Sequence, residues 1–347
     1  MNARARVERL LSAANHVFGA NRRGDLVERL AYEAGLHPRV VADALDHSLE
    51  LQPTHAELDA LVRRAVPRPA TVVSLSANVF IAPLRAIAWA LASSEDVRVR
   101  PSRRARAFVD ALFGAAPGLY ARIEDGQDAH ASLLRAIECL PPSGAVHAYG
   151  SDAGLEALAP SVGSRPFERH GPGFGAIALR APPDARTAEA LARDTAAFDQ
   201  RGCLSPRIVF VEGDSTQTAD RLHEALESLS VDLPPTPDPA MLGALARAAD
   251  AARMIGRALR GTGSLVLDLG TGAPFTLAPG GRSLTVHAVA DAAKAIAALG
   301  LCPTIVATDD ATLALPPGVR RSRPGEMQRP PLDGPVDLRA LAVEERE

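Results

Sequence analysis

A cysteine stands between two patterned segments in AAFDQRGCLSPRIVFVEG, residues 196–213. Cys203 follows Gly202, a residue type that lets backbone and ligand approach closely. It precedes an apolar run that is typical of a buried strand. A thiol on such a turn can act as a nucleophile when its surroundings ionise it. A cysteine beside glycine and leucine is, however, more often a small buried residue. The local sequence leaves both roles open.

Two glycine-rich segments are candidates for nucleotide binding. LVLDLGTGAP, residues 265–274, is similar to the strand and turn that receive adenosylmethionine in methyltransferases, but Pro274 and Pro279 interrupt the helix that should follow. GPGFG, residues 171–175, precedes a strand and therefore offers no helix N-terminus to an anion. We interpret both as structural turns, and a methyltransferase is a minor alternative.

Residue usage argues against several other kinds of chemistry. Lys294 is the only lysine and lies in a plain helical pattern, which disfavours Walker-type phosphate loops and Schiff-base catalysis. Cys139, Cys203 and Cys302 lie far apart, without histidines at ligand spacing, so no metal site is expected. A net charge of −3 without a basic cluster disfavours a nucleic-acid surface.

The hydrophobic fraction of 47% and charged fraction of 23% are typical of a globular protein. The most apolar window, NVFIAPLRAIAWALAS, is too short to span a bilayer and contains Arg85, so no membrane segment is expected. The N-terminus is amphipathic and contains Glu8, unlike a transit peptide. An odd number of cysteines without a signal peptide indicates a reducing cytoplasm.

The predicted secondary structure that positions these residues changes along the chain from helices alone to alternating strands and helices. Residues 1–65 have apolar positions at helical spacing and predict a helical lead-in. From residue 71, short β-branched runs alternate with helical stretches, which predicts βαβ units and a parallel sheet, with ligands at the carboxyl ends of the strands. After LPPTPDPA, residues 233–240, a long helical run is expected to about Leu259. Residues 326–347 are rich in proline and charge and predict an arm or a disordered tail.

The segment FDQRGCLSPRIVFVE resembles the active-site cysteine segment of acyl-CoA reductases related to the bioluminescence fatty acyl-CoA reductase, a branch of the aldehyde dehydrogenase superfamily. Other segments follow in that family's order, over about residues 70–310: VVSLSANVFIAPLRAIAWAL, VRVRPSRRA, VHAYGSDAGLEAL and RHGPGFGAIAL. The resemblance implies an α/β fold of the aldehyde dehydrogenase type, with two Rossmann-like parallel-sheet domains after the lead-in. We expect an NADP-binding domain at 66–172 and a catalytic domain with the cysteine nucleophile at 173–325.

The resemblance also implies roles for individual residues. Cys203 matches the nucleophile that takes the acyl group from a thioester. Asn78 matches the side chain that, with the cysteine N–H, binds the oxyanion, although it could also be a helix cap. His170 stands where hydrolytic relatives have a glutamate base. Losing that glutamate favours reduction over oxidation to an acid, and His170 either transfers a proton or is simply packed.

The cofactor implied by the resemblance is NADPH. In VRVRPSRR, Arg100 and Arg103 replace the lysine and glutamate of a superfamily segment that holds the adenosine ribose, and Ser102 lies between them. Guanidinium groups bind a 2′-phosphate, which a carboxylate would repel. A solvated basic helix start is the alternative. Gly150 and Ser151 match the Gly-Ser turn that faces the pyrophosphate.

The expected substrate is an acyl-CoA or an acyl-carrier thioester, reduced to an aldehyde through an S-acyl-cysteine. The partner could be a second copy of the chain or an acyl-activating enzyme. The rival hypothesis is a non-catalytic, reductase-like scaffold, because the lead-in is shorter than in fuller members and the glutamate is missing. An acyl adduct on Cys203 would distinguish the two.

Overall fold

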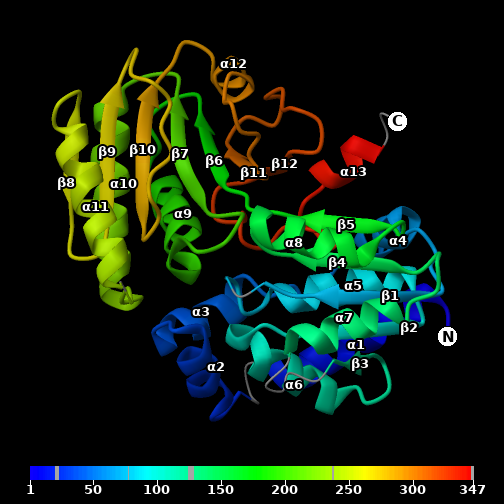
Figure 1. Cartoon of the computed structure of the whole chain (residues 1–347). Helices are drawn as coiled ribbons and strands as arrows, with labels where there is room; N and C mark the ends of the chain where they lie inside the picture. The colour runs from blue at the N-terminus through cyan, green and yellow to red at the C-terminus, as the bar shows by residue number, and fades with distance from the viewer. Residues whose placement is uncertain (20–22, 77, 124–128, 237, 345–347) are drawn as a thin grey trace. The chain divides into compact units, whose positions relative to one another are not determined.

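The structure is a computed structural model that describes residues 1–19, 23–76, 78–123, 129–236 and 238–344 (Figure 1). The chain forms two compact units. Unit 1 contains residues 1–35, 49–172 and 331–340, whereas unit 2 is built mainly from residues 36–48 and 173–330. The first helices of the chain are therefore divided between the two units.

Unit 1 contains a five-stranded, all-parallel sheet with the strand order β3-β2-β1-β4-β5. Its elements are α1 (Ala3–Phe18), α2 (Leu26–Ala34), α4 (His55–Arg64), β1 (Ala70–Ser74), α5 (Ala82–Ser93), β2 (Asp96–Arg100), η2 (Arg103–Ala105), α6 (Arg106–Ala115), β3 (Ala121–Arg122), α7 (Ala129–Glu138), β4 (Ala145–Tyr149), α8 (Asp152–Val162) and β5 (Phe167–His170). From β1 the chain adds strands first on one side (β2, β3) and then on the other (β4, β5). The carboxyl ends of β1 and β4 therefore form a topological switch point.

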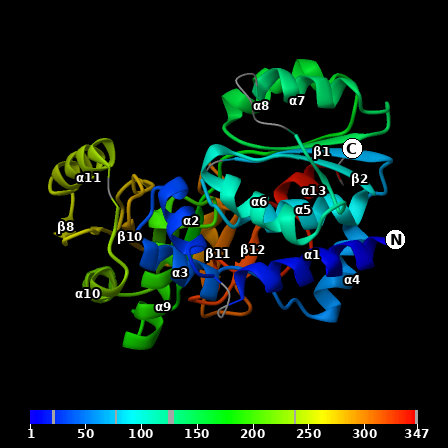
Figure 2. The ribbon, with the colours of Figure 1, turned by 90° about the horizontal axis from the view of Figure 1, so that it is seen from below.

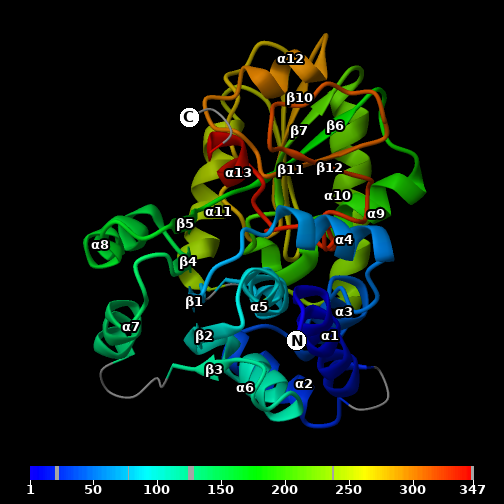
Figure 3. The ribbon, with the colours of Figure 1, turned by 90° about the vertical axis from the view of Figure 1, so that its right-hand side faces the viewer.

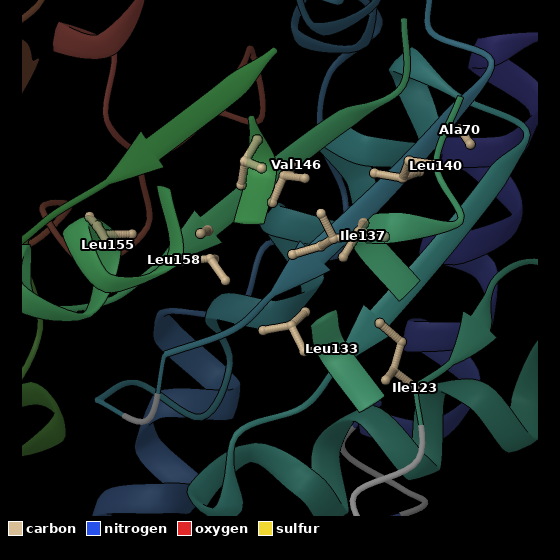
Figure 4. Close-up of a cluster of buried hydrophobic side chains, with 11 residues drawn as sticks. Ala70, Ile123, Leu133, Ile137, Leu140, Val146, Leu155 and Leu158 are labelled. Atoms are coloured by element: carbon tan, nitrogen blue, oxygen red, sulfur yellow. The ribbon is translucent and has the colours of Figure 1, made fainter. Parts of the chain in front are cut away.

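Helices cover both faces of the unit 1 sheet. Figure 2 shows α7 and α8 on one face and α5 and α6 on the other. The first face is held by a cluster in which side chains of β1 and β4 pack against α7 and α8 (Figure 4); it contains Ala70, Val72, Ile123, Leu133, Ile137, Leu140, Val146, Ala148, Leu155, Leu158 and Val162. Strand β1 is buried along its whole length, as expected for a central parallel strand covered on both faces.

Unit 2 contains a seven-stranded sheet with the order β12-β11-β6-β7-β10-β9-β8. Its elements are α3 (Pro38–His47), β6 (Gly175–Leu179), α9 (Ala185–Ala196), η3 (Ala197–Gln200), β7 (Pro206–Val211), α10 (Ser215–Asp232), α11 (Pro239–Ala252), β8 (Arg257–Arg260), β9 (Leu265–Gly270), β10 (Ser283–Ala288), α12 (Ala292–Ala297), β11 (Ile305–Thr308) and β12 (Arg320–Ser322); α13 (Arg339–Glu344) ends the described chain. Helices α11 and α12 pack on one face of this sheet. Figure 3 shows α9 and α10 together on the other face.

The prediction of a helix to about Leu259 is wrong. Helix α11 ends at Ala252, and β8 then pairs antiparallel with β9 at the sheet edge. Gly256 makes the reversal possible, because a Cβ at this position would lie 2.1 Å from the carbonyl oxygen of Asp268. Pairing with a buried neighbouring strand thus overrides the helical pattern of the local sequence.

The C-terminal region contributes buried residues to each unit. In unit 2, Met327 is fully buried, and the Asp194 carboxylate accepts hydrogen bonds from the backbone N–H groups of Gly325 (2.7 Å) and Met327 (3.0 Å). In unit 1, Leu332 is buried and Asp333 pairs with Arg64 at 3.2 Å. Among the described helices, none is long and apolar enough to cross a membrane.

Candidate active site

Cys203 lies in unit 2, on the short turn between η3 and β7. Its side chain is half-buried, while Gly202 and Leu204 on either side are buried. Strand β7 follows with the sequence PRIVFV and lies between β6 and β10 in the middle of the sheet. Cys203 thus lies on a turn three residues before the amino end of a central, buried strand.

The backbone before Cys203 is strained. Phe198, Asp199 and Gln200 are three consecutive non-glycine residues with φ values of 54°, 50° and 60°. Left-handed conformations of this kind cost about 1 kcal/mol or more per residue and persist only where the surroundings impose them. Here the surroundings include the Gln200 amide, whose Nε2 donates to the carbonyl oxygens of Pro206 (2.5 Å) and Ser283 (2.6 Å).

After Cys203, the backbone of the turn packs closely against Gly175 at the start of β6. The Gly175 N–H donates to the carbonyl oxygen of Ser205 at 2.8 Å. A Cβ on Gly175 would lie 2.5 Å from the carbonyl oxygen of Leu204 and 2.5 Å from Met327 Cε. Gly175, the last glycine of GPGFG and the first residue of β6, thus packs directly against the cysteine turn.

The five predicted cofactor residues and Asn78 all lie in unit 1, where they follow three neighbouring strands (β1, β2 and β4) at their carboxyl ends. Asn78 follows β1, Arg100 is the last residue of β2 with Ser102 and Arg103 just beyond it, and Gly150 and Ser151 follow β4. Because β1 and β4 flank the switch point, this edge is where a doubly wound sheet binds a dinucleotide. The Asn78 side chain is exposed.

The end of β2 contains buried polar atoms that lack partners. Ser102 Oγ and Arg100 Nε are buried without a hydrogen-bond partner among the described residues. Arg100 Nη1 lies 3.5 Å from Ser74 Oγ on β1, and Arg103 is exposed. Because buried polar groups are nearly always satisfied, these atoms fit a site that a polar ligand completes.

The turn after β4 offers room and a helix N-terminus. Ser151 caps α8, and its Oγ accepts a hydrogen bond from the Gly154 N–H at 3.2 Å. A Cβ on Gly150 would meet no atom within 4 Å, so the space above it is open. The Gly150 N–H donates to the carbonyl oxygen of His170 at 3.1 Å. Donors for an anion must therefore come from Ser151 and the first turn of α8.

His170, at the end of β5, is packed inside unit 1. The residue is 4% exposed, and its ring stacks on that of Tyr149 with centroids 4.2 Å apart. Burial, followed by repulsion from His147, lowers the pKa of His170 to about 4, so the imidazole is neutral at pH 7. Its role in proton transfer stays a prediction, and this environment favours the packing alternative.

Several well-ordered polar groups were missed by sequence reasoning. Glu168 accepts a hydrogen bond from the Trp89 indole and lies 3.3 Å from His147 Nε2. Asp199 forms a buried ion pair with Arg282, 83 residues away. No local pattern marks these partners, because each contact joins segments that are far apart in sequence. The described residues contain no cluster of three or more potential metal ligands.

Comparisons with known proteins agree with this architecture. An NADP-dependent glyceraldehyde-3-phosphate dehydrogenase from Bacillus halodurans C-125, complexed with NADP, superposes with a TM-score of 0.63 and 16% identity over 90% of this chain and 75% of that one. A lactaldehyde dehydrogenase from Escherichia coli gives a TM-score of 0.60 and 16% identity over 90% and 76% of the two chains. At these identities the similarity shows the fold alone, and it confirms the predicted aldehyde dehydrogenase-like α/β architecture.

Sequence comparison goes further than the fold. No curated protein matches the chain. Residues 27–237, however, match the profile of the acyl-CoA reductase (LuxC) family, and this match covers more than half of the chain, including Asn78, His170 and Cys203. It confirms the resemblance carried by the Cys203 segment. The chain thus belongs to the acyl-CoA reductase (LuxC) family and is an oxidoreductase with an aldehyde dehydrogenase-like fold.

Proposed function

We propose that this protein reduces an acyl thioester to an aldehyde with NADPH, through an acyl group carried on Cys203. The observation that carries the proposal is the position of Cys203, half-buried on a strained turn before the central strand β7, inside the segment that matches the family. The overall reaction converts acyl-CoA, NADPH and one proton into aldehyde, CoA and NADP⁺. CoA or an acyl-carrier protein would deliver the acyl group.

Cys203 would perform two steps. Its thiolate forms a carbon–sulfur bond to the carbonyl carbon of the thioester, and the bond from that carbon to the sulfur of CoA breaks, so that CoA leaves as a thiolate and is then protonated. After the carbonyl carbon is reduced, the bond to Cys203 breaks and the thiolate is restored. As the family resemblance implies, Asn78, an exposed residue after β1, would donate a hydrogen bond to the oxyanion.

The carboxyl ends of β2 and β4 fit a nicotinamide dinucleotide. The unpartnered atoms of Arg100 and Ser102 would bind the adenosine end, and the turn at Gly150 and Ser151 would hold the pyrophosphate. The exposed guanidinium of Arg103 would favour a 2′-phosphate and hence NADPH over NADH. When bound, the cofactor supplies a hydride.

His170 is the least supported member of the proposed site. With a pKa near 4 it is unprotonated at pH 7 and is a weak base, so it would remove a proton from Cys203 less effectively than an ordinary histidine. A glutamate base is not needed here, because the acyl group moves from one thiol to another and no water has to be activated. A homo-oligomer or a complex with an acyl-activating enzyme in the cytoplasm would suit this reaction.

Mass spectrometry of the intact protein and its peptides tests the proposal. We incubate the protein with acyl-CoA in the absence of NADPH and expect one acyl group on Cys203, which NADPH then removes as aldehyde. Cys203→Ser should abolish both signals, whereas Cys139→Ser and Cys302→Ser, at exposed cysteines, should not. A well-folded protein without an adduct on Cys203 would instead be a non-catalytic scaffold.

A further inference from the structure

A buried ion pair holds the turn that carries Cys203, and one of its two partners, Arg282, lies outside the segment that matches the family. Arg282 Nε and Nη2 donate to Asp199 Oδ1 at 3.0 and 2.7 Å. The Arg282 side chain is 0% exposed and that of Asp199 is 7% exposed. Arg282 lies in unit 2 beyond residue 237, where the family match ends.

The pair is part of a larger anchor. Asp199 Oδ2 accepts from the Thr236 N–H at 3.0 Å, and Arg282 Nη1 donates to the carbonyl oxygen of Leu233 at 2.6 Å. Arg201 Nη2 lies 3.8 Å from the same carboxylate. A single arginine thus ties the segment before Cys203 to the end of α10.

Adjacent residues repeat the connection. Gln200 follows Asp199, Ser283 follows Arg282, and the Ser283 N–H donates to Gln200 Oε1 at 2.8 Å. Two neighbouring residues of one segment therefore bind two neighbouring residues of the other. Both Asp199 and Gln200 have left-handed backbone angles, so these bonds impose the conformation that the local chain disfavours.

We infer that Arg282 and Asp199 are positioning residues, which hold the turn so that the Cys203 thiol is presented for attack on the thioester. The inference rests on the proposed function of Cys203. The alternative is that the pair only stabilises unit 2. The two hypotheses predict different results. If the pair only stabilises unit 2, any substitution that restores stability should also restore Cys203 reactivity. If the pair positions the turn, stability can be restored while Cys203 reactivity stays low.

The variants separate these roles. Arg282→Met removes the two-nitrogen contact to the buried Asp199 carboxylate, which destabilises the fold. The double variant Arg282→Met/Asp199→Asn removes both charges with little change of shape. It should regain much of the lost stability. Arg282→Lys keeps one charge without the two-nitrogen contact. Arg257→Met is the matched control, because it removes the partner of Asp268, another buried carboxylate of unit 2.

Two rates are measured on Cys203: acylation by acyl-CoA, and alkylation by iodoacetamide across a range of pH, with Cys139 and Cys302 as exposed internal references. We expect both rates at Cys203 to fall about 10- to 100-fold in Arg282→Met and in the double variant, because small displacements of a reacting group have effects of that size. Lysine should recover part of the loss. Alkylation at the two reference cysteines, and all rates in Arg257→Met, should stay unchanged.

A cavity next to the pair allows chemical rescue. It has a volume of about 310 Å³, and Asp199, Arg282 and Leu245 are among the residues that line it. Methylguanidine can therefore reach the space left by Arg282→Ala. We expect it to restore Cys203 reactivity in that variant in a saturable manner and to have no effect on Arg257→Met.

Two outcomes would overturn the inference. One is Cys203 rates within twofold of wild type in folded Arg282→Met. The other is recovery of these rates together with thermal stability in the double variant. If Arg282→Met does not fold, the same Cys203 rates in Arg282→Lys and in the double variant test the inference. If wild-type Cys203 is never acylated, the proposed function fails, but the alkylation series still decides whether Arg282 controls the thiol.

Discussion

The indole N–H of Trp89 donates a hydrogen bond of 2.6 Å to the Glu168 carboxylate, joining α5 to β5 within unit 1. The same carboxylate lies 3.3 Å from His147 Nε2. Burial by itself would raise the pKa of Glu168, but the charge of His147 and the bonds from His147 and Trp89 outweigh it and lower the pKa to about 2. The half-buried Glu168 thus stays ionised in its contacts with α5 and β4.

This pKa predicts how stability depends on pH. Because the folded pKa of Glu168 lies below its unfolded value, its contribution is fully present above about pH 5 and is lost as pH falls toward 2. We expect a loss of about 2–3 kcal/mol, measured by urea unfolding at several pH values. Glu168→Gln should remove this component. Equal pH dependence in wild type and variant would contradict the argument.

The pKa of His170 predicts a second, separate component of the pH dependence of stability. Its folded pKa of about 4 lies below the ordinary histidine value, so its contribution is present above pH 6.5 and declines as pH falls toward 4. His170→Phe keeps a ring to stack on Tyr149 and should flatten this part of the stability curve. We also expect no inflection near pH 6.5 from His170 in kcat/KM. An inflection there that disappears in His170→Phe would show that the imidazole titrates normally.

Reversing the charge of residue 103, just after β2, should weaken the preference for NADPH over NADH. In Arg103→Glu we expect kcat/KM for NADPH to fall by about tenfold or more, because a contact between a guanidinium and a phosphate is replaced by repulsion. The value for NADH should hold or rise. Arg104→Glu is the control, since Arg104 is an equally exposed neighbour in η2. An unchanged ratio in Arg103→Glu would remove Arg103 from the proposed site.

Gly175→Ala should displace the part of the turn that follows Cys203. The new Cβ would lie 2.5 Å from the carbonyl oxygen of Leu204, and that backbone must move. We expect lower stability and slower acylation of Cys203. Gly114→Ala is the control: this exposed glycine of α6 has no atom within 4 Å of a new Cβ, and alanine there should stabilise by about 0.5–1 kcal/mol. Normal Cys203 acylation in Gly175→Ala would contradict the prediction.

The sequence alone was sufficient for the alternation of strands and helices in unit 1 and for the family. Strand β1 and helix α5 follow from the β-branched run TVVS and the apolar helix after it, and the segment around Cys203 indicated an acyl-CoA reductase. These inferences succeed because strand and helix periodicity and short motifs are local properties of a chain. They failed at β8, where antiparallel pairing with β9 overrides a helical pattern.

Only the tertiary structure decided which groups meet. Arg282 reaches Asp199, Glu168 reaches Trp89, and Gly175 touches the turn of Cys203 through contacts between distant segments. It also decided the pKa of His170, because burial and repulsion from His147 lower that pKa to about 4. Burial and long-range contacts depend on how elements pack, and no short stretch of sequence encodes that packing.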